Sequence, residues 1–258
     1  MTDFSARSIV ASTLLGTLPP RLPGRLLVAF AEEFGVNPGT TRVALSRMVE
    51  RGELTREPDG HYRLAGPLLE RQRRQEAGLA PRVHRWSGDW EMYLVRGGAR
   101  DAGERAALRQ AAAHLGLRER REGVWLRPDN LDPERLPSAR VVLESQTERF
   151  VATPGDDPGA LAVGLFELEA WAAVAESLRG QMSVMADALE AGTPGALAQG
   201  FELAAHGLRH LVADPLLPVE LCPPDWPAPE LRECYDHYDR TYRRHLSAFF
   251  RSRSRLAG

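Results

Sequence analysis

The sequence contains no lysine, so its 33 basic residues are all arginines. It has only two cysteines, Cys222 and Cys234, which excludes the disulfide framework of a small secreted protein. No apolar run approaches the ~20 residues that a helix needs to cross a bilayer, and we see no signal peptide. We therefore expect a cytoplasmic protein that makes no membrane contact.

Motifs for cofactor and metal binding are also missing. Gly97-Gly98 belongs to neither GxGxxG nor GxxxxGK[ST], so it does not form a phosphate loop. His206 and His210 have a spacing that suits two metal ligands, as do Cys234 and His237, but neither pair has a third ligand nearby in the sequence. We therefore predict no cofactor, no metal site and no catalytic residues.

The net charge of −2 hides an uneven distribution. Residues 1–80 carry 11 arginines against 9 acids, and residues 81–239 carry 16 against 26. Residues 240–258 carry 6 arginines and no acid. Positive charge at the two ends of an anionic chain is a modest electrostatic signal for DNA binding.

The stretch that organises the chain is residues 36–63, which predicts a turn, a helix and a two-stranded hairpin. Asn37 is a good N-cap residue, and Pro38 suits the first helical position. Gly52 is typical of the residue that ends a helix. Pro58-Asp59-Gly60 predicts the hairpin turn. A helix followed at once by a hairpin is the order of a winged helix-turn-helix.

The two faces of this helix separate when each residue is turned through ~100°. The predicted core face consists of Thr41, Ala44, Leu45 and Met48, with Val49 at its edge. The opposite face carries Thr40, Val43, Ser46 and Arg47, and Arg42 lies on the flank, where it can contact a phosphate or form an internal salt bridge. Small hydroxyls, one methyl-bearing side chain and an arginine can contact base edges and phosphates, although a plain solvated face has the same composition. The candidate DNA-binding residues of the helix and hairpin are Thr40, Thr41, Arg42, Val43, Ser46, Arg47, Arg56, His61 and Arg63.

Hydrophobic spacing divides the rest of the chain and predicts an α+β protein. Helices at residues 5–18 and 23–34 complete a winged-helix domain at 1–66, and an arginine-rich linker helix follows at 67–80. A strand-helix-strand-strand order over residues 81–155 suggests a small ferredoxin-like α+β domain. Its expected strands are 90–95, 117–120, 123–127, 140–143 and 149–152, with a helix at 101–115. Residues 156–258 are expected to form a helical domain that dimerises or binds an effector. The aromatic stripe of its final helix predicts a core or a dimer seam, with the wall of a ligand site as the less favoured alternative.

An effector site is harder to place. Arginines could bind the phosphates of an acyl-CoA, and tryptophans could contact its acyl group. The candidates near the expected domain junction are Arg82, Arg85, Trp86, Trp90 and Trp226. The alternative, in which the tryptophans are core residues and the arginines are solvated, is slightly favoured over an effector site.

Several stretches resemble the PaaX family of transcriptional repressors, which control phenylacetate catabolism. The predicted recognition helix matches that family's pattern at Arg42, Ala44, Ser46, Arg47, Gly52 and Leu54. SGDW at residues 87–90 resembles the start of the family's central domain, and DPLLPVELCPPDWP at residues 214–227 is similar to its C-terminal signature. The sequence departs from the family at Cys222, where leucine is more usual, and in a shortened linker between Leu18 and Arg25.

This resemblance implies an N-terminal winged helix, a central domain similar to the small CRISPR-associated ferredoxin-like endoribonucleases, and a helical C-terminal domain. It also implies a homodimeric repressor that is released from its palindromic operator by an aryl- or acyl-CoA such as phenylacetyl-CoA.

Two other classes of function remain open from the sequence. One is an enzyme with an accessory winged helix, either a metal-dependent nuclease or a protein that processes acyl-CoA. The related nucleases place a metal-binding aspartate at the end of the first strand, whereas this strand ends in Leu94-Val95-Arg96. The other is a protein-interaction module that uses the winged helix to bind a protein. We expect a DNA-binding regulator and not an enzyme.

Overall fold

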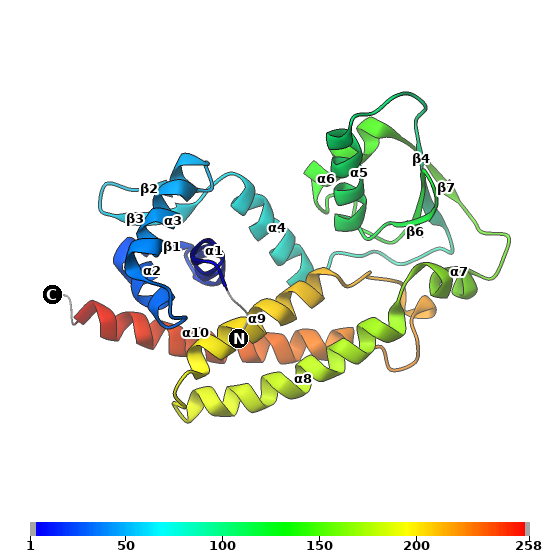
Figure 1. The fold of residues 1–258 in the computed structure, drawn as a ribbon. Coiled ribbons are helices and arrows are strands. Elements are labelled where there is room, and N and C mark those ends of the chain that lie inside the picture. The colour runs from blue at the N-terminus through cyan, green and yellow to red at the C-terminus, as the bar shows by residue number, and fades with distance from the viewer. Residues whose placement is uncertain (1–3, 256–258) are drawn as a thin grey trace. The chain divides into compact units, whose positions relative to one another are not determined.

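The computed structural model describes residues 4–255 (Figure 1). Residues 1–3 and 256–258, which include the ends of the first and last domains expected from the sequence, lie outside the described part. The chain forms two compact units. The first contains Met1–Arg73, Ser177–Leu208 and Arg232–Gly258, and the second contains Arg74–Glu176 and Arg209–Leu231.

The first unit begins with a small helical domain that carries a three-stranded sheet. Its elements are α1 (Ala6–Gly16), β1 (Arg21–Pro23), α2 (Gly24–Glu32), α3 (Pro38–Glu50), β2 (Leu54–Arg56), β3 (His61–Leu64) and the start of α4 (Pro67–Leu79). The strand order is β1-β3-β2, and both pairs are antiparallel. The three helices and the hairpin were predicted from the sequence, whereas β1 was not.

An aromatic cluster joins this small domain to the C-terminal helices of the same unit. Phe30 of α2 contacts Phe201 of α9 (Ala196–Val212) with ring centroids 5.6 Å apart. Phe249 and Phe250 of α10 (Ala228–Arg255) each lie 5.9 Å from the Phe30 ring. These edge-to-face contacts bury Phe30 completely, so the last helix forms part of the core that supports α2.

The aromatic stripe of α10 is also buried within the single chain. Tyr235, Tyr238 and Tyr242 are at most 4% exposed, and the Tyr238 hydroxyl donates to the Gly200 carbonyl at 2.8 Å. A side chain at Gly200 would approach that hydroxyl to 3.1 Å, so glycine permits close packing of α9 on α10. Among the roles predicted for the aromatic stripe, the structure therefore shows that it forms part of the core. The same unit holds residues 177–190 of α8 (Leu168–Glu190).

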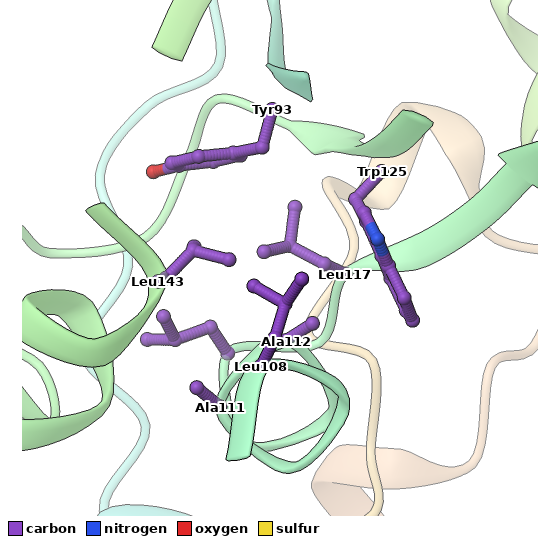
Figure 2. Close-up of a cluster of buried hydrophobic side chains, with 8 residues drawn as sticks. Tyr93, Leu108, Ala111, Ala112, Leu117, Trp125 and Leu143 are labelled. Carbon is purple, nitrogen blue, oxygen red and sulfur yellow. The ribbon is translucent and has the colours of Figure 1, made fainter. Parts of the chain in front are cut away.

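The second unit contains a four-stranded antiparallel sheet with helices on one face. Its elements are β4 (Trp90–Val95), α5 (Ala102–His114), β5 (Arg118–Arg121), β6 (Val124–Pro128), α6 (Pro137–Gln146) and β7 (Thr147–Ala152). The strand order is β5-β6-β4-β7. Figure 2 shows the core on this face, where Tyr93 of β4 and Trp125 of β6 lie over Leu108 of α5 and Leu143 of α6.

One predicted strand of this unit was wrong. Residues Arg140–Leu143 belong to α6, which starts with Pro137 at its first turn. The two valines at 141 and 142 favour a strand locally, but Leu143 is fully buried against α5 and needs helical spacing to reach it. The helix at α5 starts as predicted, where Asp101 and Glu104 form a reciprocal capping box.

The other face of the sheet is covered by α7 (Pro158–Leu165) and the short 3-10 helix η1 (Val219–Leu221). Trp90, Phe166 and Leu221 form the centre of this second cluster. The mixed α+β class expected from the sequence is therefore confirmed. Within residues 4–255, no single helix is both long and apolar enough to span a bilayer. Taken together, α7 and α8 have sufficient length and apolar composition, but the pair is bent by 64°.

Candidate nucleic-acid interface

The candidate interface is built on α3, whose ends are fixed by local sequence. The Asn37 side chain accepts a hydrogen bond from the Gly39 backbone N–H at 2.8 Å, and Pro38 occupies the first turn. Arg51 caps the other end, and Gly52 follows with φ of +66°. This left-handed conformation favours glycine, so the chain can turn sharply from α3 into the hairpin.

The two faces of α3 divide as the helical spacing predicts. Leu45 and Met48 are almost completely buried against the core. Val43 is 51% exposed, so its methyl groups are accessible on the solvent face of the helix. The exposed residues of α3 that the sequence singled out are Thr40, Arg42, Val43, Ser46 and Arg47.

Thr41 requires a correction. We included it among the candidate DNA-binding residues, but its side chain has no exposed surface. It faces the domain core together with Leu45 and Met48, because residues 41, 45 and 48 recur at helical spacing. A fully buried side chain cannot reach a base or a phosphate.

The exposed face of α3 carries positive charge that no carboxylate neutralises. Neither Arg42 nor Arg47 forms an ion pair with any residue that the structure describes. Of the two roles predicted for Arg42, the internal salt bridge is therefore absent among the described residues, and its guanidinium is available for a phosphate contact. Both guanidinium groups are therefore free to pair with phosphate or with the base edge of guanine.

A groove of about 440 Å³ runs between this face and the start of α1. Thr40, Val43 and Arg47 line one side, and Ser5 and Arg7 line the other. Arg51 also lines it. Arg7 and Arg51 were not among the predicted residues, because Arg7 precedes α3 by about 30 residues and Arg51 lies at the C-terminal cap of α3.

The hairpin is less basic than its sequence suggested. Glu57 accepts hydrogen bonds from Arg21 at 2.6 Å and from Arg63 at 3.3 Å. The Nδ1 atom of His61 lies 2.9 Å from an Asp59 carboxylate oxygen, and Arg21 also contacts Asp59. Two of the three candidate residues of the hairpin, His61 and Arg63, thus already have acidic partners.

These contacts also set the charge state of the hairpin turn. Partial desolvation raises the pKa of the Asp59 carboxyl, but hydrogen bonds from His61 and Arg21 outweigh it and hold the pKa below the usual value. Asp59 therefore stays ionised at neutral pH. Arg56 is exposed and has no ion-pair partner among the described residues, which makes it the available cation of the hairpin.

The aromatic candidates for the effector site come together as part of a core. Trp86 and Trp226 pack against the cluster centred on Trp90, which is 2% exposed. Trp226 also stacks on Trp171 at 4.7 Å, and the Trp86 ring N–H donates to the Asp89 carbonyl at 2.7 Å. Arg82 and Arg85 are exposed in the segment before β4. The structure therefore joins the three tryptophans and leaves the two arginines in solvent.

His210 and Cys222 pack against neighbouring residues, whereas His206 and His237 are exposed. His210 stacks on Trp171 with ring centroids 4.3 Å apart, and its Nε2 atom lies 2.9 Å from the Trp171 carbonyl oxygen. Burial raises the pKa of the Cys222 thiol to about 12, so it is not a thiolate at neutral pH. In the part of the chain that the structure describes, no three His, Cys, Asp or Glu residues gather to hold a metal ion.

Comparisons with known proteins agree with the arrangement of elements. Residues 5–68 match the family described as PaaX-like protein, and residues 166–252 match the PaaX-like protein C-terminal domain. A solved structure, the uncharacterized protein Rv0674 from Mycobacterium tuberculosis, is 38% identical and has a TM-score of 0.69. The similarity covers 95% of this chain and 98% of that one. No curated protein gives a significant match. The chain therefore belongs to the PaaX family, a family of transcriptional regulators.

Proposed function

We propose that this protein is a DNA-binding repressor that contacts its operator through α3. The observation that carries the proposal is the exposed face of α3, where Thr40, Val43, Ser46 and Arg47 project without an acidic partner. Arg47 can donate two hydrogen bonds to guanine, and Val43 can contact a thymine methyl group. Arg42 is assigned to the phosphate backbone because of its flank position.

The N-terminal elements support a winged helix-turn-helix as the DNA-binding fold. Helices α1, α2 and α3 are followed at once by the β2–β3 hairpin, and β1 pairs with β3 on its other side. In such a fold the second helix of the motif enters the major groove and the hairpin lies along the backbone. We assign Arg56 to a phosphate contact, while His61 and Arg63 hold the shape of the hairpin through their acidic partners.

The second unit supports the ferredoxin-like assignment for the central domain. Its elements follow the order strand, helix, strand, strand, helix, strand, with the first and third strands at the centre of the sheet. We retain domains at residues 1–66, 81–155 and 156–258, with a linker helix at 67–80, as the proposed functional division. The C-terminal helices α8, α9 and α10 contribute residues to both compact units.

Binding to a palindromic operator requires two copies of α3, spaced so that each reaches one half-site. We propose a homodimer that places one α3 in each half-site of a palindromic operator, with half-sites about one helical turn apart or a multiple of it. An aryl- or acyl-CoA effector such as phenylacetyl-CoA would release the operator by binding more tightly to a dimer geometry that cannot span both half-sites. Arg82 and Arg85 are the exposed cations nearest the tryptophan cluster in sequence, and we propose them as contacts for the effector's phosphates.

The proposal is tested with full-length protein and the genomic DNA fragments that it retains. We expect one recurring palindrome among the retained fragments, a dimeric mass in sedimentation, and loss of the DNA complex when phenylacetyl-CoA is added. Retention of fragments that share no sequence, with binding seen only at low salt, would contradict operator recognition. Retention of the complex at saturating phenylacetyl-CoA would contradict that effector but not DNA binding.

An enzyme with an accessory winged helix is not favoured, because the matched family is one of regulators.

A further inference from the structure

The second unit contains a partly enclosed cavity of about 180 Å³, and none of the tryptophans lines it. It lies between the turn that joins α5 to β5, the end of β6, and the segment that follows α9. That last segment is Asp214-Pro215-Leu216, the beginning of the proline-rich C-terminal signature. The sequence analysis did not assign any binding role to this region.

Basic side chains outnumber acidic ones in the lining of the cavity. Arg118, Arg127 and Arg135 line it together with His114, and Asp214 is the acidic residue among the lining residues. Neither Arg118 nor Arg127 forms an ion pair within residues 4–255. A small cavity with an excess of guanidinium groups favours an anion, because the attraction between charges grows as water is excluded.

Arg127 is the most buried of these arginines, with 1% of its surface exposed. Its guanidinium donates to the carbonyls of Pro128 and Leu115 and to the side-chain oxygen of Asn130. These are neutral acceptors, so they orient the guanidinium without neutralising it. Desolvation lowers the pKa of Arg127 to about 9, although the carboxylate of Glu91, its cross-strand neighbour on β4, partly offsets this effect.

The local backbone keeps the space beside this guanidinium open. Gly116 has φ of +68°, and a side chain there would approach the Nη1 atom of Arg127 to 2.6 Å. On the other side, Asn130 donates to the Leu216 carbonyl at 2.9 Å, and the Asp214 carboxylate accepts from the Leu216 N–H at 2.9 Å. The wall formed by residues 214–216 is thus held in place by hydrogen bonds.

Arg118 completes the site from the edge of the sheet. It is half-buried, and its guanidinium carbon lies 5.3 Å above the ring centroid of Phe166. Its Nη1 atom donates only to the Leu117 carbonyl among the described residues, which leaves several donors for a ligand. The cation–π contact with Phe166 holds the guanidinium near the ring without using those donors.

We propose that this cavity binds a small oxyanion, either a carboxylate or a phosphate group, between Arg118 and Arg127. Its volume accommodates an anionic group and a few further atoms. The oxyanion accepts hydrogen bonds from both guanidinium groups and places a negative charge in direct contact with Arg127, which the described structure shows hydrogen-bonded only to neutral acceptors. The site does not depend on DNA binding.

The test is a calorimetric titration of DNA-free, full-length protein with sodium phosphate and, separately, with sodium acetate. Sodium chloride at matched ionic strength controls for screening. We expect saturable binding of phosphate or acetate, and the stronger of the two identifies the source of the anionic group. Equal, non-saturating heats in all three salts would overturn the proposal.

Two variants localise the binding. Arg118→Gln removes one charge-assisted contact and should weaken binding roughly tenfold or more. Arg120→Gln is the matched control, because Arg120 is exposed on the same strand and does not line the cavity. Ala113→Glu adds a carboxylate at an exposed lining position and should compete with the added anion. Unchanged affinity in both Arg118→Gln and Ala113→Glu would also overturn the site.

Discussion

Arg7 and Glu53, which are 46 residues apart in the sequence, form a two-pronged ion pair in the first unit. Both nitrogen–oxygen distances are 2.9 Å. Glu53 is 8% exposed and directly precedes β2, while Arg7 belongs to the first turn of α1. The pair therefore fixes the start of the hairpin against the helix that lines the groove beside α3.

Replacing Glu53 with glutamine should destabilise the protein measurably. The side chain keeps its shape but loses the charge that both Arg7 nitrogens contact. Since Arg7 remains partly solvated, we expect a loss of about 1 kcal/mol in the free energy of unfolding, measured by urea denaturation. Glu70→Gln is the control, because its pair with Arg73 lies on an exposed helix face and should contribute about 0–0.5 kcal/mol. Equal losses in the two variants would contradict the structural role of Glu53.

Replacement by valine should affect different properties at Thr40 and Thr41: DNA affinity at Thr40 and stability at Thr41. The Thr41 hydroxyl is buried and has no hydrogen-bond partner among the described residues. Thr41→Val should therefore raise the free energy of unfolding by about 1 kcal/mol and leave DNA affinity unchanged. Thr40→Val removes an exposed hydroxyl and should weaken operator binding without changing stability. A loss of DNA affinity in Thr41→Val would contradict the orientation of α3.

Two helical glycines, one in each compact unit, provide a test of helix packing. A side chain at Gly78 of α4 would approach the Val212 backbone to 3.0 Å, so Gly78→Ala should destabilise by about 1–3 kcal/mol in thermal unfolding. Gly180 of α8 has no atom within 4 Å of that position, and Gly180→Ala should stabilise by about 0.5–1 kcal/mol. Stabilisation by Gly78→Ala would show that α4 and the end of α9 are not in contact.

His210 should make stability depend on pH. Desolvation lowers its pKa below the ordinary value of 6.5, so the unfolded state takes up a proton more readily than the folded state. Stability is therefore unaffected above about pH 7.5 and falls as the pH is lowered through 6.5. Burial and the nearby Arg74 lower the pKa of His114 as well, so both residues contribute. We expect His210→Gln to flatten part of this fall in urea denaturation between pH 5.5 and 7.5, and an identical slope would contradict the assignment.

The helix α3 was predictable because every signal for it is local. Asn37, Pro38 and Gly52 set the ends of α3, and helical spacing separates its faces. The capping box at Asp101 and Glu104 is local for the same reason. Signals of this kind do not depend on which other elements pack against the helix.

The features that the sequence did not predict depend on partners far along the chain. β1 is only three residues long and exists because it pairs with β3, about 40 residues later. Residues 140–143 are helical because Leu143 packs against α5. The arginine cavity likewise joins residues 113–118, 127, 135 and 212–216, which have no common motif. No local pattern specifies such long-range contacts.

The measurement that tests the proposed function most directly is operator binding by Arg47→Ala. Arg47 has no acidic partner among the described residues, so its loss should not disturb the fold, which circular dichroism can verify. We expect affinity for the isolated operator to fall by about 1–3 kcal/mol, or roughly 5- to 150-fold, in a mobility-shift assay. Arg25→Ala, on the exposed side of α2, is the matched control and should bind as the natural protein does. Unchanged operator affinity in Arg47→Ala would contradict the assignment of α3 as the recognition helix.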